Sequence, residues 1–146
     1  MKTIKTKRQV LDISMIEEEF FEDAFLMGIV CPLPSYRFIW NIEQYFHFLF
    51  ERRHEFEVEA NSGCFEVYTC CEEEKLVEHT IYTNRKGTSY LIPEAKNIDF
   101  IWMIKGSYLP AEYRNLLPGN LQNVAIIDHC FIIDAGQLKS RQHLIL

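Results

Sequence analysis

The chain has 146 residues, of which 48% are hydrophobic and 25% are charged, and its formal net charge is −6. This fits a single globular domain over residues 1–146 that is large enough to fold without a disulfide or a structural metal. Nucleic acids and anionic lipids are bound mainly by clustered Lys and Arg, so the acidic balance disfavours both partners. The basic residues 2–8 are the exception, and we interpret them as a solvated segment rather than a contact with an anionic partner.

The sequence also predicts a location for the protein. No apolar stretch with a cleavage site follows the basic N-terminus, so we expect no secretory signal. No run approaches the roughly 20 apolar residues that a membrane-spanning helix needs. Five cysteines without a regular framework favour a reducing compartment. We therefore expect a cytoplasmic protein that binds neither membrane nor nucleic acid.

The N-terminal part begins with weak alternation over residues 1–14, which is compatible with an extended edge strand. An acidic patch over residues 17–23 is interleaved with two phenylalanines, and we interpret it as a charged outer face beside two core aromatics. Residues 25–31 form a short apolar run that ends at Pro32. That length and boundary predict a buried strand.

A helix is expected next, with Ser35 as its cap and Phe50 as its end. A helical wheel places one hydrophobic face toward the core, made of Phe38, Ile39, Ile42, Tyr45, Phe46 and Leu49. Trp40, His47 and Phe48 fall on the opposite side. Large exposed aromatics are typical of interfaces, so these three residues are candidates for contact with a protein partner or a second copy. The alternative is that another segment of the same chain covers them.

The middle of the chain is rich in β-forming residues. Residues 65–70 alternate, residues 72–75 form an acidic turn, and residues 79–83 are again β-rich, which predicts a hairpin or meander. A third strand is expected over residues 89–92. Residues 98–104 are apolar on both alternating faces, apart from one aspartate, which predicts a central strand covered on both sides.

The C-terminal part contains a predicted short helix over residues 110–117 that ends at Pro118, a long β-rich run over residues 124–133, and a helical turn with a short terminal strand within residues 137–146. Strands in meanders with two main helices predict an α+β layered domain whose sheet is largely antiparallel. A ferredoxin-like core with extra strands is one candidate for this arrangement.

The cysteines do not form a recognisable metal site. Structural zinc usually takes Cys-x₂₋₄-Cys pairs, and the neighbours Cys70 and Cys71 point to opposite faces of a strand. We interpret the thiols as buried or unreactive, and a redox sensor built on Cys70 or Cys71 would need an exposed thiol with a lowered pKa. The tripeptide Asp128-His129-Cys130 looks like a compressed triad, but on a strand His129 points away from both neighbours, so a structural role is favoured.

Residues 92–100 read Ile-Pro-Glu, three further residues, and then Ile-Asp-Phe. Pro93 favours the first position of a helical turn that Asn97 could close. Glu94 near that start would interact with the helix dipole, and Asp99 at a strand entry can accept backbone or Arg hydrogen bonds that fix the turn. The alternative is an acid–base pair, which needs convergent carboxylates in a cleft. We favour a structural role for Pro93, Glu94 and Asp99.

This pattern resembles the signature of the IPExxxVDY family, small proteins of Bacteroidetes-type bacteria without an established activity. Here Ile98 and Phe100 stand where the family pattern has Val and Tyr, so the hydroxyl of the pattern is absent. Other similarities spread over nearly the whole chain: Gly28-Ile29, Tyr36-Arg37, Ile104-Lys105-Gly106 and Leu138-Lys139-Ser140. The resemblance implies a cytoplasmic bacterial protein and supplies no catalytic residue, cofactor or metal ligand.

No phosphate-binding glycine loop, Gly-x-Ser-x-Gly elbow or His-Glu-x-x-His helix occurs in the sequence. We therefore expect a non-enzymatic protein-interaction or regulatory module, with a homodimer as one form, and no cofactor. The alternative is a small-molecule-binding regulator or an enzyme, with Glu94, Asp99 and a histidine lining one deep pocket. A thiol redox sensor is the third hypothesis.

Overall fold

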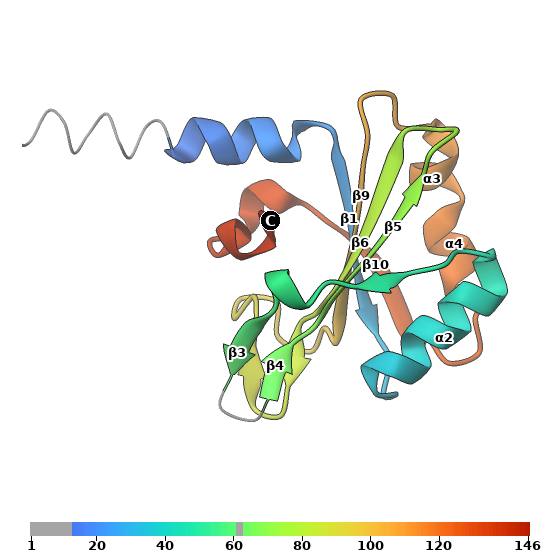
Figure 1. The fold of residues 1–146 in the computed structure, drawn as a ribbon, viewed down its shortest axis with the longest axis horizontal. Helices are drawn as coiled ribbons and strands as arrows, with labels where there is room; N and C mark the ends of the chain where they lie inside the picture. Colours follow the sequence, from blue (N-terminus) through green and yellow to red (C-terminus); the bar gives the residue numbers. More distant parts are fainter. Residues whose placement is uncertain (1–12, 61–62) are drawn as a thin grey trace, which may run out of the picture.

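The computed structural model describes residues 13–60 and 63–146, in which helices and strands occur in similar proportion (Figure 1). The helices are an N-terminal helix described over residues 13–22, α2 (Ser35–Phe46), α3 (Ala111–Asn115) and α4 (Leu117–Gln122). The strands are β1 (Ala24–Val30), β2 (Glu51–Arg52), β3 (Val58–Ala60), β4 (Gly63–Phe65), β5 (Val67–Glu72), β6 (Val77–Thr83), β7 (Arg85–Lys86), β8 (Ser89–Tyr90), β9 (Phe100–Lys105) and β10 (His129–Ile133). Three 3₁₀ turns are η1 (His54–Phe56), η2 (Ala135–Gln137) and η3 (Arg141–Leu144).

Six strands form one sheet in the order β10-β1-β9-β6-β5-β2, and every neighbouring pair is antiparallel. The prediction of an α+β domain with a largely antiparallel sheet is confirmed. Within this sheet, β10-β1-β9-β6 has the strand order of a ferredoxin-like core, because α2 connects β1 toward β6, and α3 with α4 connects β9 to β10. The strands β5 and β2 extend that core at one edge.

The sheet is covered on both faces, as predicted for its central strand β9. Phe100, Trp102 and Ile104 of β9 pack in the core on the helix side, whereas Ile101 and Met103 pack on the other side. In Figure 1 α2, α3 and α4 lie on one side of the sheet, and the C-terminal segment lies on the other. This alternation follows from the period of two along a strand, and it explains the unbroken apolar run in the sequence.

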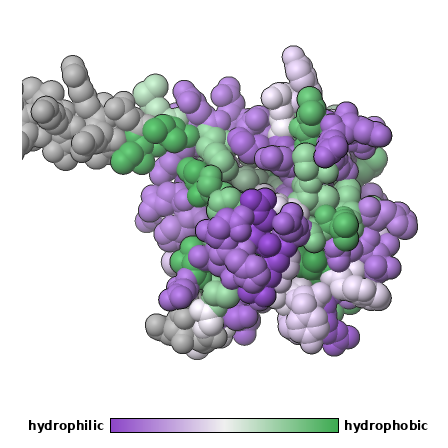
Figure 2. Space-filling model, in the orientation of Figure 1, coloured by the Kyte–Doolittle hydropathy of each residue, from purple (hydrophilic) through white to green (hydrophobic). Residues whose placement is uncertain are grey.

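The N-terminal helix was not predicted over its described part. Residues 13 and 14 are helical where an edge strand was expected, and the rest of that expected strand lies outside the described residues. The predicted outer face with two core aromatics is confirmed, since Phe21 is buried and Phe20 packs against the same core. Figure 2 shows hydrophilic side chains over much of the side of the molecule that is turned to the viewer. Hydrophobic side chains appear on the N-terminal helix, where Ile13 and Met15 are exposed.

Helix α2 is shorter than predicted and begins differently. Its N-cap is Pro34, and no side chain in the described part of the chain caps it, because the Ser35 hydroxyl donates to Glu66 instead. The helix ends at Phe46, and His47 adopts a left-handed conformation with φ 60°. The helical-wheel prediction is therefore wrong for the residues after His47, because the chain changes direction there. Phe48 therefore turns back onto the core, and Leu49, expected in the core, is exposed.

The β-rich middle of the chain departs from prediction in two places. The predicted strand over residues 65–70 divides at Glu66 into β4 and β5, although the hairpin from β5 to β6 is confirmed. The strand expected over residues 89–92 is only the two-residue β8, and the expected helical turn after it is a series of turns and bends. Asn97 does adopt the left-handed conformation expected of a closing residue, with φ 73°.

The prediction that Pro118 ends the helical part of this region is wrong. Pro118 lies in the first turn of α4, where its missing N–H has no partner to lose, so it starts a second helix rather than ending the first. The strand predicted over residues 124–133 begins only at His129, because Val124 and Ile127 pack into the core from a turn. Residues 138–146 hold η3 and no strand. In the described part of the chain, no helix is long and apolar enough to cross a membrane.

Candidate functional site

The signature loop of residues 92–99 is held against the sheet by one buried amide. Asn84 has no exposed surface, and its side-chain N–H groups donate to the carbonyl oxygens of Ala95 and Ile98, each at 2.9 Å. Its side-chain oxygen accepts a hydrogen bond from the Ile92 amide, also at 2.9 Å. Three hydrogen bonds from one side chain therefore fix the loop that carries Glu94 and Asp99.

The two carboxylates of the signature have separate partners. Asp99 Oδ2 accepts a hydrogen bond from the Cys31 amide at 2.9 Å, and its Oδ1 lies 3.8 Å from Arg85. Glu94 accepts hydrogen bonds from the Ser140 amide at 2.5 Å and the Ser140 hydroxyl at 3.1 Å. Asp99 was predicted to accept a backbone hydrogen bond that fixes a turn, and its bond from the Cys31 amide fixes the chain at the end of β1. Glu94 ties the loop to the C-terminal segment, and no helix starts beside it.

A cleft of about 770 Å³ lies where β1 ends and α2 begins. It is lined by the turn before α2, by the start of β9 and by the ends of neighbouring strands. Its polar and charged lining residues are Ser35, Tyr36, Glu66, Thr83, Arg85, Lys86, Asp99 and Asp128. Asp99 therefore lines a cleft as well as fixing a turn. Glu94 is not among these residues, and no histidine is among the described residues that line the cleft.

One hydroxyl in the cleft lacks a partner. Thr83 is 4% exposed, and its Oγ1 finds no hydrogen-bond partner among the described residues. Thr83 shares a strand face with Ile81, two residues earlier, so its side chain lies on the helix side of the sheet, below the start of α2. A buried hydroxyl without a hydrogen bond costs about 1–3 kcal/mol. A ligand or water in the cleft would remove that cost.

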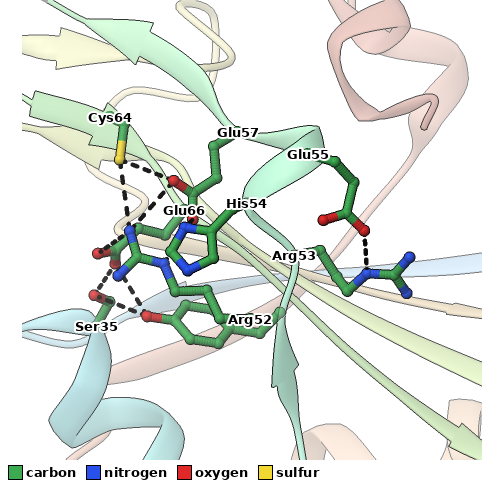
Figure 3. Close-up of polar contacts among 9 residues, drawn as sticks. Ser35, Arg52, Arg53, His54, Glu55, Glu57, Cys64 and Glu66 are labelled. Carbon is green, nitrogen blue, oxygen red and sulfur yellow. Dashed lines mark hydrogen bonds and ion pairs between the residues drawn. The ribbon is translucent and has the colours of Figure 1, made fainter.

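Glu66, which lines the cleft, is held in a polar network (Figure 3). Its Oε2 accepts hydrogen bonds from the hydroxyls of Ser35 and of Tyr68, the latter at 3.2 Å, and its Oε1 lies 3.4 Å from Arg52. Arg52 in turn donates to Glu57 at 2.6 Å. The carboxylate of Glu66 is thus neutralised and held by three neighbours, so it forms a fixed part of the wall.

The other carboxylates of the cleft have less compensation. Burial raises the pKa of Asp99 above its ordinary value, the Cys31 amide and Arg85 oppose that rise, and the charge of Asp128 adds to it. Burial also raises the pKa of the Cys31 thiol, and Asp99 and Asp128 contribute in the same direction. Asp128 is exposed, and its carboxylate makes no hydrogen bond or ion pair within residues 13–60 and 63–146. This part of the cleft therefore disfavours further negative charge.

A second polar cluster is buried beneath α3, away from the cleft. Trp102 Nε1 donates to His79 Nδ1 at 3.0 Å, so the neutral imidazole carries its proton on Nε2. That nitrogen lies 3.5 Å from Glu72 and has no hydrogen-bond partner among the described residues. Burial lowers the pKa of His79, and Glu72 opposes this effect. Tyr113 donates its hydroxyl to the same Glu72 carboxylate.

The three residues proposed for an interface are not equivalent. Trp40 is 58% exposed and lies one helical turn from Tyr36, which is 69% exposed. His47 is exposed at the end of α2. Phe48 is half-buried, with its ring centroid 4.6 Å from that of His79, so it is part of the core packing. Only Trp40 and His47 remain available to a partner, and Tyr36 joins them.

The cysteines are free thiols in distinct surroundings. Cys64 donates to Glu57 at 3.2 Å, which is the main reason that its pKa is raised (Figure 3). Burial raises the pKa of Cys70, whereas Cys71 is exposed. In the tripeptide over residues 128–130, His129 is exposed and Cys130 is buried, as the alternation of a strand predicts. Within the described ranges, no group of three His, Cys, Asp or Glu side chains could hold a metal ion.

Comparison with known proteins identifies no family for this chain. No family model matches the chain, and neither does any curated protein or solved structure. The resemblance to the IPExxxVDY family therefore stays a prediction.

Proposed function

We propose that this protein is a regulatory module that binds a small polar molecule in the cleft between the start of α2 and the edge of the sheet. The observation that supports this most directly is the buried Thr83 hydroxyl, which lacks a partner and lines a cleft of about 770 Å³. That volume falls within the range of small-molecule sites, roughly 300–1,000 Å³. Of the two carboxylates expected in a small-molecule pocket, Asp99 lines this cleft and Glu94 does not.

Binding is favoured over catalysis because two carboxylates of the cleft are already engaged. Asp99 accepts the Cys31 amide, and Glu66 is surrounded by Ser35, Tyr68 and Arg52. A general base must be available to the proton that it removes. These groups instead give the cleft a fixed shape and polarity, which is what recognition needs.

The test is a screen of small polar compounds by amide chemical-shift mapping. We expect at least one compound to shift the amide signals of Thr83, Gly87 and Phe100, which line the cleft. The matched control is Thr83→Val, which keeps the side-chain shape and removes the hydroxyl. This variant should fold at least as stably as the wild type and bind the compound several-fold more weakly. If no compound shifts these signals, or if the variant binds equally well, the proposal is wrong.

A second candidate function is self-association through the outer face of α2. Its specific support is the exposure of Trp40 and Tyr36 beside a groove that Ile126 also lines. The test is the molar mass in solution of the wild type and of Trp40→Glu. A dimeric wild type and a monomeric variant would support this function, and a monomeric wild type at high concentration would contradict it.

A further inference from the structure

We infer that the ligand of the cleft carries a primary ammonium group, which lies between the carboxylates of Asp99 and Asp128. This inference rests on the proposed function and names the chemical class of the ligand. It follows from the distribution of charge along the lining and from the groups that already neutralise one another.

The carboxylates of the cleft differ in how well they are compensated. Glu66 has a guanidinium 3.4 Å away and two hydroxyl donors, so it needs no further counter-charge. Asp99 has one amide donor and a loose ion pair of 3.8 Å with Arg85, whose side chain is 53% exposed. Asp128 has neither a hydrogen bond nor an ion pair within the described ranges. The least compensated carboxylates of the cleft are therefore Asp99 and Asp128.

Asp99 and Asp128 lie just before two different strands, at the same corner of the sheet. Asp99 precedes β9, Asp128 precedes β10, and β1 lies between these two strands. The Asp99 amide donates to the Ile29 carbonyl and the Asp128 amide donates to the Val30 carbonyl, each at 2.9 Å. Each carboxylate raises the pKa of Cys31, the residue after β1, which indicates that both act on the same small region. A cation placed there is attracted by both.

The unpartnered Thr83 hydroxyl points to a ligand that also accepts or donates a hydrogen bond. Thr83 is paired with Phe100 across β6 and β9, next to Asp99 in the chain. An ammonium group offers three donors, and three residues with acceptor oxygens line the same cleft: Thr83, Asp99 and Asp128. A hydroxyl oxygen accepts such a bond as readily as it donates one, so one ligand group can use all three.

Two kinds of molecule share this chemistry: free amino acids and aliphatic amines. An amino acid would also place a carboxylate in the cleft, where Arg85 is exposed enough to turn toward it. An aliphatic diamine would leave Arg85 paired with Asp99. The recognised group is the ammonium in both cases, and the experiment separates the two sources.

The test is isothermal titration of the full chain with four probes. The first pair is the set of standard L-amino acids other than lysine and proline, titrated one by one, and their N-acetylated forms, which lack the ammonium. The second pair is 1,4-diaminobutane and 1,4-butanediol. We expect saturable binding in one ammonium arm and none for its uncharged match. Binding by an amino acid identifies that source, and binding by the diamine identifies the other.

The matched variants are Asp128→Asn and Asp99→Asn. Asp128 is exposed and makes no hydrogen bond through its side chain within the described residues, so Asp128→Asn should fold normally and weaken binding by about threefold. Asp99→Asn keeps an oxygen for the Cys31 amide and should weaken binding by about tenfold or more. The inference would be overturned if both variants bound the ammonium probe as tightly as the wild type does. Binding of the acetylated or uncharged probes would overturn it as well.

The failure of the ligand class and the failure of the proposed function give different results. If the compound screen finds ligands of the cleft but neither ammonium arm binds, the ligand class is wrong and the small-molecule function stands. If no compound of any class perturbs Thr83, Gly87 and Phe100, both are wrong.

Discussion

Asp99 and Cys31 are 68 positions apart in the chain, and the Asp99 carboxylate accepts the Cys31 amide at 2.9 Å. This bond joins the signature loop to the turn that leads into α2, so the same side chain fixes a backbone corner and lines the cleft. The sequence suggested either a structural role or a site role for Asp99, and these two roles are therefore compatible with each other.

The charge of Asp99 should cost stability. Its folded-state pKa is raised, so its contribution to stability is complete below the unfolded pKa and is lost as pH rises through the folded value. At pH 7, Asp99→Asn removes the charge and keeps the acceptor, and we expect it to stabilise the fold by up to about 1 kcal/mol. Asp99→Ala leaves the Cys31 amide without its partner and should destabilise by about 2 kcal/mol. Urea unfolding at pH 7 measures both, and a destabilised Asp99→Asn would contradict this account.

Asn84 should be among the most sensitive polar positions in the protein. Asn84→Ala removes three buried hydrogen bonds and leaves the carbonyls of Ala95 and Ile98 unpaired, so we expect a loss of about 2–4 kcal/mol in the free energy of unfolding. The control is Asn41→Ala on α2, which removes one exposed hydrogen bond of 2.8 Å and should change stability by less than about 0.5 kcal/mol. Similar values for the two variants in urea unfolding would show that the loop does not depend on Asn84.

Gly28 should not tolerate a side chain. A Cβ at this position of β1 would lie 2.9 Å from Ile98 Cδ1 and 3.0 Å from Ile133 Cδ1, with Phe131 close by. Because the ends of these three side chains must shift to make room, Gly28→Ala should destabilise by about 1 kcal/mol. Gly119→Ala is the matched control, since nothing lies within 4 Å of its Cβ and alanine favours the helix α4. A thermal melt should give a lower midpoint for the first variant and an equal or higher one for the second.

His79 should make stability depend on pH above the range where carboxylates titrate. Burial lowers its pKa from 6.5 in the folded chain, so the unfolded chain binds the proton more readily. Its contribution is therefore complete above about pH 6.5 and is lost as pH falls below that value, by at most about 1.4 kcal/mol per pH unit. His79→Gln should flatten the dependence between pH 7 and pH 5, which urea unfolding across that range measures. Parallel curves for the wild type and His79→Gln would refute this role.

Much of the architecture could be predicted because it depends on local pattern. The apolar runs at β1 and β9 indicated buried strands, and the acidic turn before His79 indicated the hairpin of β5 and β6. The end of α2 could not be predicted, because His47 adopts its left-handed conformation without a glycine. A single residue in that conformation moved Phe48 from the outside of a predicted helix into the core.

The cleft could be predicted only in part. Asp99 was named from the signature, but Asp128 precedes β10 and Thr83 ends β6, and sheet order is what brings all three to one cleft. Thr83 did carry a signal, since a hydroxyl stands where the alternation after Ile81 calls for an apolar side chain. Asn84 looked like an ordinary turn residue, and only tertiary structure shows that it is fully buried.

The position of β1 between β9 and β10 also has a consequence for biosynthesis. The ribosome produces β1 well before β9 and β10, which are its two hydrogen-bonding neighbours in the sheet. Pairings between such distant segments fold slowly, and unpaired strand edges are prone to aggregation. The nascent chain therefore carries an apolar first strand without its neighbours until β9 and β10 have both been made, and this long wait exposes it to aggregation.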